Sequence, residues 1–464
     1  MSRGEASRQS LKWDRVMVAK RLQNSSDWFL ALGVLLALLT QLRSNASILG
    51  PGEIFLACWL CVQAFQALAG MPAAQGLAPV AIFWGLFAFA LCLGLIHSIV
   101  SGVPLDSSLV IHDVFADLLL VALCVLLAPV VADQRRLSRL YLRIMTAGVA
   151  MLALQLANAA GVFALGGVDP WYWERLRGWT ANPNQFALLC LLIGFLALHV
   201  AERGSRAGAF AGWACGLLTL ASGLLGMSNA YVLVVMLGLG VLFAAKVLRW
   251  MAREERRGFP AAWLGVSLAA ALLYTGLLLA PHVMSESDLI RSAGGMARDT
   301  SKELEDSTVR LMLWRQALKR GMESGMIGYG PGPHLEIPAV VLQGRRAGDL
   351  PKNMITPELG LAANFEAHNT VLELFVQGGL LAAGGFLCIV GLAIVRAFRA
   401  GFDALAAGLI AINAFGSFHV IFRHPFFWLL MVGALSARSA CATSRAKPRP
   451  FDDFALLKPM RINQ

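Results

Sequence analysis

Residues 79–100 read PVAIFWGLFAFALCLGLIHSIV, a run without Asp, Glu, Lys or Arg. A helix needs about 20 consecutive apolar residues to cross the hydrocarbon core of a bilayer, and this run is that long. Apolar and polar side chains do not alternate along it, so it does not have the pattern of a strand in a transmembrane β-barrel. We therefore predict that residues 79–100 form a membrane-spanning α-helix.

Comparable apolar runs recur along the chain of 464 residues, of which 57% are hydrophobic and only 14% are charged. A soluble domain carries about 25% charged residues. The runs predict an all-α integral membrane protein with about twelve transmembrane helices. The expected spans are residues 27–41, 53–69, 79–100, 108–131, 140–165, 184–201, 208–224, 230–247, 261–281, 370–396, 402–419 and 425–437.

The basic residues predict how these spans are oriented. With the N-terminus inside, 25 of the 39 Lys and Arg residues fall in cytoplasmic segments, and ten of the others fall in one long outer loop. Cytoplasmic segments of membrane proteins are enriched in Lys and Arg, so we expect both termini to be cytoplasmic. The same rule accounts for the net charge of +11, and no nucleic-acid partner is expected.

This topology divides the chain into four regions. They are residues 1–281 with about nine spans, the outer loop 282–368, residues 369–440 with about three spans, and a cytoplasmic tail, 441–464. A loop as long as the second region is usually functional. Within it, residues 302–324 have the pattern of an amphipathic helix that ends before Gly325.

The eight cysteines are not spaced like those of a disulfide-bonded or zinc-binding domain, because seven of them lie in apolar runs. Cys58 and Cys61 have C-x-x-C spacing only because both fall inside one predicted span. We expect neither a disulfide framework nor a structural zinc site, and no redox function for this pair.

Four polar residues near the sixth span are candidates for substrate binding. Arg175 and Arg177 lie in an aromatic outer loop, where they would either reach lipid headgroups or capture a phosphate with two parallel hydrogen bonds. Asn182 and Asn184 flank Pro183, which predicts a helix with Asn182 as its cap. The free backbone N–H groups at such a helix end also bind anions.

Further candidates lie on the long loop and at its end. Arg310 and Trp314 are four residues apart and share one face of the predicted helix, which is either a solvated basic face or, with Arg315, a binding surface. His368 and Asn369 open the next span. His368 is either an interfacial histidine or a general base at the membrane surface.

Other charged residues lie near the ends of the spans or inside them. Arg423 is expected to extend toward lipid headgroups from the outer membrane boundary. His112, Asp113 and Asp117 fall in the fourth span. Ionisable groups inside a membrane are costly and suggest function, which would fit a proton relay in a transporter, although the outer end of the span could also be exposed.

Three segments taken together resemble the O-antigen ligase family. They are residues 178–187, GWTANPNQFA; residues 307–332, with Arg310, Trp314 and the GYGPG run; and residues 368–379, HNTVLELFVQGG. Their order and their places relative to the predicted spans are similar to those of the family. The sequence departs from it at Asn229, where relatives often carry an arginine.

The resemblance implies a helical membrane glycosyltransferase, with a fold similar to the C-type glycosyltransferases, in a bacterial inner membrane with its active site facing the periplasm. The donor would be a glycan on undecaprenyl pyrophosphate and the acceptor a sugar hydroxyl of lipid A–core, with surrounding membrane lipids as further partners. Transfer would invert the anomeric carbon and need no metal or other cofactor. His368 and Arg310 would be catalytic. The substrate would be bound by Arg175, Arg177, Asn182, Asn184, Trp314, Arg315 and Asn369.

Other functions stay open at this point. O-antigen polymerases share the donor and the topology but extend another lipid-linked glycan, and protein O-oligosaccharyltransferases transfer to Ser or Thr. The short basic tail, 441–464, disfavours the last class, which usually has an additional periplasmic C-terminal region. A lipid-linked glycan transporter or flippase would show broken helices and repeat symmetry, which the sequence does not display.

Overall fold

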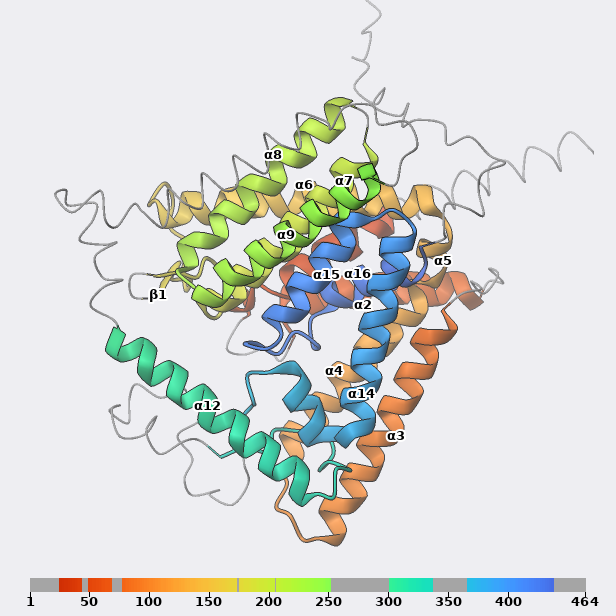
Figure 1. The fold of residues 1–464 in the computed structure, drawn as a ribbon, viewed down its shortest axis with the longest axis vertical. Helices are drawn as coiled ribbons and strands as arrows, with labels where there is room; N and C mark the ends of the chain where they lie inside the picture. The colour runs from red at the N-terminus through yellow and green to blue at the C-terminus, as the bar shows by residue number, and fades with distance from the viewer. Residues whose placement is uncertain are drawn as a thin grey trace, which may run out of the picture.

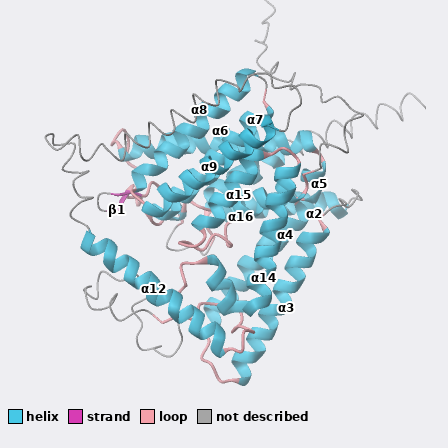
Figure 2. Ribbon diagram, viewed as in Figure 1, coloured by secondary structure: helices cyan, strands magenta, loops and turns pink. Residues whose placement is uncertain are grey.

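The computed structural model describes residues 25–43, 49–68, 77–172, 175–204, 206–251, 300–336 and 365–437. Regular structure in these ranges is almost all helical, with one small strand pair (Figures 1 and 2). The principal helices after Ser25–Leu36 are α2 (Pro51–Leu68), α3 (Ala78–Val100), α4 (Ser107–Leu126), α5 (Ala128–Ala132), α6 (Gln134–Ala159), α7 (Pro183–Arg203), α8 (Arg206–Gly223), α9 (Asn229–Met251), α12 (Thr300–Glu323), α14 (Thr370–Arg399), α15 (Asp403–Phe415) and α16 (Pro425–Leu435).

Seven helices in the described ranges are long and apolar enough to cross a membrane, so the chain is a multi-pass α-helical membrane protein. They are Ala78–Val100, Ser107–Ala132, Gln134–Ala159, Pro183–Arg203, Gly208–Gly226, Asn229–Met251 and Thr370–Arg399. The predicted spans 27–41, 402–419 and 425–437 correspond to shorter apolar helices. The predicted span 261–281 lies outside the described residues, and the total of twelve stays a prediction.

One boundary prediction is wrong by several residues. The span expected at residues 140–165 is α6, which starts at Gln134 and ends at Ala159. Asp133 caps its start by accepting hydrogen bonds from the backbone N–H groups of Arg135 and Arg136. Hydropathy alone places the start of a span at its first long apolar stretch, whereas a cap and basic residues extend the helix beyond the apolar part.

The helices form two packed groups. In the first, α7 is buried along most of its length and packs against α6, α8 and α15, while α15 also packs against α9. In the second, α14 packs against α3, α12, α15 and α16, and α12 extends away from the long helices toward the lower left of Figure 1. The helix α15 packs against α7 and α9 of the first group and against α14 of the second, so it joins the two groups.

The helix α14 is interrupted at Gly378 and Gly379, where the backbone leaves helical geometry. The segment after α12 bonds to the interrupted turn: Tyr329 N–H donates to the Val376 carbonyl (2.9 Å) and Leu380 N–H donates to the Met326 carbonyl (3.0 Å). Backbone groups freed inside a membrane need such partners. Gly379 has φ of +65°, and a Cβ atom there would clash with the Met326 carbonyl. Residues 326–330 therefore complete the broken turn of α14.

Two buried carboxylates and two partly buried cations join α7, α9 and α15. The ammonium of Lys246 lies 2.5 Å from a carboxylate oxygen of Glu202 and 3.0 Å from one of Asp403. Arg249 donates from Nε to both carboxylate oxygens of Asp403 (2.7 and 2.8 Å). These four residues, called the Asp403 network below, pair two cations with two carboxylates and so join three helices without an excess of either charge.

Candidate functional site

The helix α12 docks onto the second packed group through its apolar face. Leu313 and Ala317 are fully buried, and they form a small hydrophobic core with Tyr329, Ala367 and Val376. The helix ends at Glu323, before Gly325 with φ of +65°. The predicted amphipathic helix is thereby confirmed. Its docking brings the face that carries Arg310 and Trp314 toward the start of α14.

His368 sits immediately before α14 in an unusual backbone conformation. Its φ is +49°, in the left-handed region that residues other than glycine seldom adopt. Asn369 then caps α14, because its side-chain oxygen accepts hydrogen bonds from the N–H groups of Val371 (3.0 Å) and Leu372 (3.1 Å). The His368 ring meets the Phe365 ring edge to face, with centroids 5.5 Å apart. The cap and this ring contact fix the direction of the imidazole.

The electrostatic surroundings keep His368 neutral. Burial lowers the pKa of His368, the Glu366 carboxylate opposes that change, and the Arg310 guanidinium adds to it. Burial also holds the pKa of His419 well below its usual value, and His424, His368 and Arg310 lower it further. His368 is therefore an uncharged imidazole near pH 7, with a lone pair available to accept a proton.

The loop between α15 and α16 completes this region. The Trp314 ring packs against Phe418, with centroids 6.2 Å apart, and His419 follows directly. Thr370 holds the loop in place, because its hydroxyl donates to the His419 carbonyl (2.8 Å). We call Arg310, Trp314, His368, Phe418 and His419 the His368 cluster. Its members come from three segments that are distant in sequence and meet at one end of α14.

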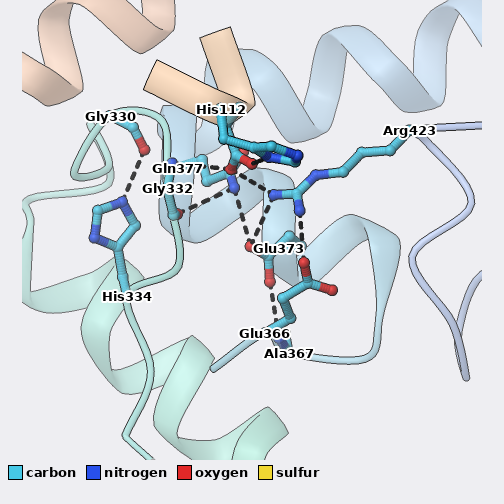
Figure 3. Close-up of polar contacts among 10 residues, drawn as sticks. His112, Gly330, Gly332, His334, Glu366, Ala367, Glu373, Gln377 and Arg423 are labelled. Atoms are coloured by element: carbon cyan, nitrogen blue, oxygen red, sulfur yellow. Dashed lines mark hydrogen bonds and ion pairs between the residues drawn. The ribbon is translucent and has the colours of Figure 1, made fainter. Parts of the chain in front are cut away.

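A second polar group, the Arg423 network, adjoins this cluster. The guanidinium of Arg423 extends between carboxylates from different segments (Figure 3). It donates from Nη1 to Glu366 (2.5 Å) and from Nη2 to Asp113 (2.7 Å), and Nη2 lies 3.9 Å from Glu373. These three carboxylates raise the pKa of Arg423 against the effect of burial. Arg423 thus connects α4, the start of α14 and the α15–α16 loop, and the expectation that it extends toward lipid headgroups is wrong.

The Arg423 network also holds the glycine-rich segment after α12. Gly332 N–H donates to Asp113 (3.1 Å), and the Gln377 amide donates to Glu373 (3.0 Å) and to the Gly332 carbonyl (3.2 Å). The Glu373 carboxylate in turn accepts from Ala367 N–H (2.8 Å), one residue before His368. Figure 3 shows Gln377 and Gly332 beside the Arg423 guanidinium and Glu373 and Ala367 below it. The network therefore fixes the backbone on which His368 is carried.

The other predicted binding residues make local contacts. Arg175 donates to the carbonyls of Gly226 (3.1 Å) and Met227 (2.9 Å), which fastens the strand pair of β1 (Trp171–Tyr172) and β2 (Arg175–Leu176) to the α8–α9 connection. Arg177 pairs with Asp169 (3.0 Å). Both arginines therefore use their side chains to hold the loop on which they lie.

The remaining predicted binding residues either cap or lie in the first turn of α7, or are exposed on α12. Asn182 caps α7 by accepting from Gln185 N–H (3.0 Å), and Pro183 is the first helical residue, so that structural prediction is confirmed. Asn184 is half-buried in the first turn of α7, and Arg315 is exposed on α12. Of the predicted site residues, the structure brings Arg310, Trp314 and Asn369 into the region of His368.

Sequence reasoning missed the contribution of four residues, Glu366, Glu373, His419 and His424. Glu373 and Gln377 are polar residues four apart in an otherwise apolar run, a spacing that places both on one helix face and could have indicated an internal partner. His419 and His424 stack with ring centroids 5.8 Å apart, and sequence alone does not reveal this pairing.

No family model matches the sequence, and a search of curated proteins found no match. The seven cysteines in the described ranges are all free thiols. Those ranges contain no group of three or more His, Cys, Asp or Glu residues placed to hold a metal ion. The chemistry that the site can perform therefore has to be argued from the His368 cluster and the Arg423 network.

Proposed function

We propose that the protein is a glycosyltransferase of the O-antigen ligase type in a bacterial inner membrane. It transfers a glycan from undecaprenyl pyrophosphate to a sugar hydroxyl of lipid A–core at the periplasmic face. The observation that carries the proposal is the neutral, rigidly held His368 at the end of a membrane helix, with Arg310 beside it. An imidazole base next to a guanidinium suits a reaction that removes a proton and releases an anion.

In the proposed reaction, the acceptor hydroxyl oxygen attacks the anomeric carbon of the donor sugar. The bond between that carbon and the pyrophosphate oxygen breaks, and the undecaprenyl pyrophosphate leaves as an anion. His368 takes the hydroxyl proton, which contributes roughly 10²–10⁴-fold to the rate. Attack from the face opposite the leaving group inverts the anomeric carbon.

Arg310 is the residue we assign to the leaving group. A guanidinium placed where negative charge develops contributes about 10²–10³-fold, as removal of such groups shows in other enzymes. Its planar fork also suits bidentate binding of phosphate oxygens. Both proposed substrates are lipid-anchored and the protein spans the membrane, so all three are confined to one bilayer, which reduces the entropy lost when they meet.

A second candidate function is favoured by the Arg423 network. Asp113 and Glu373 lie on membrane-spanning helices and are buried. Ionisable groups in such positions mark ion or proton pathways in transporters. A lipid-linked glycan transporter is therefore the alternative to a transferase, and it predicts movement of the donor without any acceptor.

The decisive experiment is transfer by the purified protein in vitro, with undecaprenyl-pyrophosphate glycan as donor and lipid A–core as acceptor. Glycan that appears on lipid A–core supports the ligase proposal. A donor that lengthens without lipid A–core indicates a polymerase. Donor that crosses the bilayer of a proteoliposome, with no transfer by folded protein, contradicts the proposal and favours the transporter.

A further inference from the structure

Two buried polar atoms near His368 have no hydrogen-bond partner among the described residues. They are the indole Nε1 of Trp314 and Nε2 of His419. Unsatisfied buried polar atoms are costly and rare in folded proteins, and each one needs an explanation. Phe418 connects the two, because its ring packs on Trp314 and its backbone continues into His419.

The position of His419 is fixed by contacts that leave this ring atom unused. The Thr370 hydroxyl donates to the His419 carbonyl (2.8 Å) and accepts from Ile421 N–H (2.9 Å), so the loop is held beside the start of α14. The His419 ring stacks on His424 with an interplanar angle of 17°. A ring held in this way offers a preorganised hydrogen-bonding atom to a ligand, at no further cost in side-chain entropy.

The chemistry of the two atoms points to hydroxyl groups as the ligand. An indole N–H is only a donor, whereas a neutral imidazole nitrogen donates or accepts according to its tautomer. Burial lowers the pKa of His419 well below its usual value and that of His424 to about 4, so neither ring carries a charge near pH 7. Uncharged groups beside two aromatic rings suit a sugar better than a phosphate, because the apolar face of a pyranose packs on aromatic side chains while its hydroxyls bond to the polar atoms.

We propose that Trp314 and His419 form the subsite for the acceptor sugar, with Nε1 and Nε2 bonding to hydroxyls that neighbour the attacking one. This inference rests on the proposed transferase function. The attacking hydroxyl has to reach His368, and Thr370, two residues further along the chain, bonds to the His419 carbonyl, so a sugar held by Trp314 and His419 lies beside the base. Arg310 serves the leaving group, and Trp314 and His419 serve the acceptor.

The test uses substitutions that remove the polar ring atoms and keep an aromatic ring. Trp314→Phe deletes the indole N–H, and His419→Phe deletes the imidazole nitrogens. Loss of one hydrogen bond to a bound hydroxyl is expected to raise the KM for lipid A–core roughly three- to tenfold in each variant. The KM for undecaprenyl-pyrophosphate glycan is expected to stay at the wild-type value. His419→Gln, which supplies a side-chain amide that donates and accepts hydrogen bonds, is expected to recover part of the acceptor affinity.

The matched control is Trp59→Phe. Trp59 is fully buried on α2, and its Nε1 also has no partner among the described residues, so the substitution makes the same chemical change outside the His368 cluster. Its KM for lipid A–core should equal that of the wild type. Size-exclusion profiles and thermal unfolding of every variant in detergent show whether the fold is kept, and His419→Gln stands in for His419→Phe if the latter unfolds.

The outcomes separate this inference from the function on which it depends. Wild-type protein that transfers no glycan overturns both. Wild-type transfer together with an unchanged KM for lipid A–core in Trp314→Phe and in the folded His419 variant overturns the subsite and leaves the transferase proposal standing. An increase confined to the KM for the donor glycan also overturns it, because the two atoms would then bind the donor sugar.

Discussion

The Asp403 network and the Arg423 network are both largely buried sets of ion pairs between distant segments, but they differ in composition. Lys246 and Arg249 match the two carboxylates of Asp403 and Glu202, whereas Arg423 faces Asp113, Glu366 and Glu373. The first arrangement is sufficient to hold helices together. The second gathers three carboxyl groups around one guanidinium, and its hydrogen bonds to the backbone of Gly332 and Ala367 point to a role in positioning as well as in packing.

The largest expected difference between the two regions concerns their histidines. His368→Ala or His368→Gln should lower kcat for transfer roughly 10²–10⁴-fold, because no base then takes the acceptor proton. His199 on α7 is buried beside Glu202 of the Asp403 network and provides the control. The substitution His199→Gln should leave kcat per folded molecule unchanged. Equal losses in both variants would mean that the effect comes from the fold.

Arg310 should have the next largest effect. Arg310→Ala is expected to lower kcat about 10²–10³-fold, since the leaving pyrophosphate loses its charge partner. Arg310→Lys should recover little, because an ammonium cannot replace a planar fork. Arg320 lies on the same helix and pairs with Glu336 at the surface (3.2 Å), so Arg320→Ala is the matched control and should transfer normally. Wild-type kcat in Arg310→Ala removes this residue from the mechanism.

Arg423→Lys and Arg249→Lys make the same change in the two networks. Arg423 bonds to Glu366 and Asp113 through separate nitrogens, and one ammonium cannot reproduce that geometry. The resulting shift of the His368 backbone should lower kcat by up to about 100-fold. Arg249→Lys should cost about 1 kcal/mol of stability or less and leave kcat unchanged, because Lys246 already bridges Glu202 and Asp403. The measurements are transfer kinetics and thermal unfolding. A kcat in Arg423→Lys equal to that in Arg249→Lys would show that the contacts of Arg423 do not position His368.

The smallest expected effect is a dependence on pH. Burial lowers the pKa of His368, so the acid limb of kcat/KM should lie below the pH at which an ordinary histidine titrates. Stability should follow the same direction. The pKa of His368, His419 and His424 is lowered in the folded state, so the stability that these groups contribute is present above pH 6.5 and is lost as the pH falls toward their folded values. A pH–rate profile with its acid limb above pH 7 contradicts the assignment of His368 as the base.

Local features of the fold followed from the sequence, and contacts between distant segments did not. Asn182 next to Pro183 predicted the start of α7, and the amphipathic pattern predicted α12, because caps and periodicity depend on a few neighbouring residues. The pairing of Arg423 with Asp113 joins residues 310 positions apart. Hydropathy orders spans along the chain but gives no information on which spans are neighbours, so Arg423 looked like a residue at the lipid surface.

Sequence also identified some residues of the candidate site and misjudged others. His368, Arg310 and Trp314 stood out because their residue types and their places near a span end suited a reaction at a membrane surface. Arg175 has the same residue type and a similar position, yet its donors bond to the Gly226 and Met227 carbonyls. A phosphate and a backbone carbonyl both attract a guanidinium, so sequence could not separate a binding arginine from a structural one.

The completed turn of α14 also determines when the site can assemble during synthesis. Residues 326–330 bond to residues 376–380, which leave the ribosome about fifty residues later. The segment that carries Arg310 and Trp314 thus has no docking surface until α14 has been inserted. A nascent chain in the membrane consequently passes through a stage in which its earlier helices are in place and the His368 cluster is still incomplete, because Phe418 and His419 are made last.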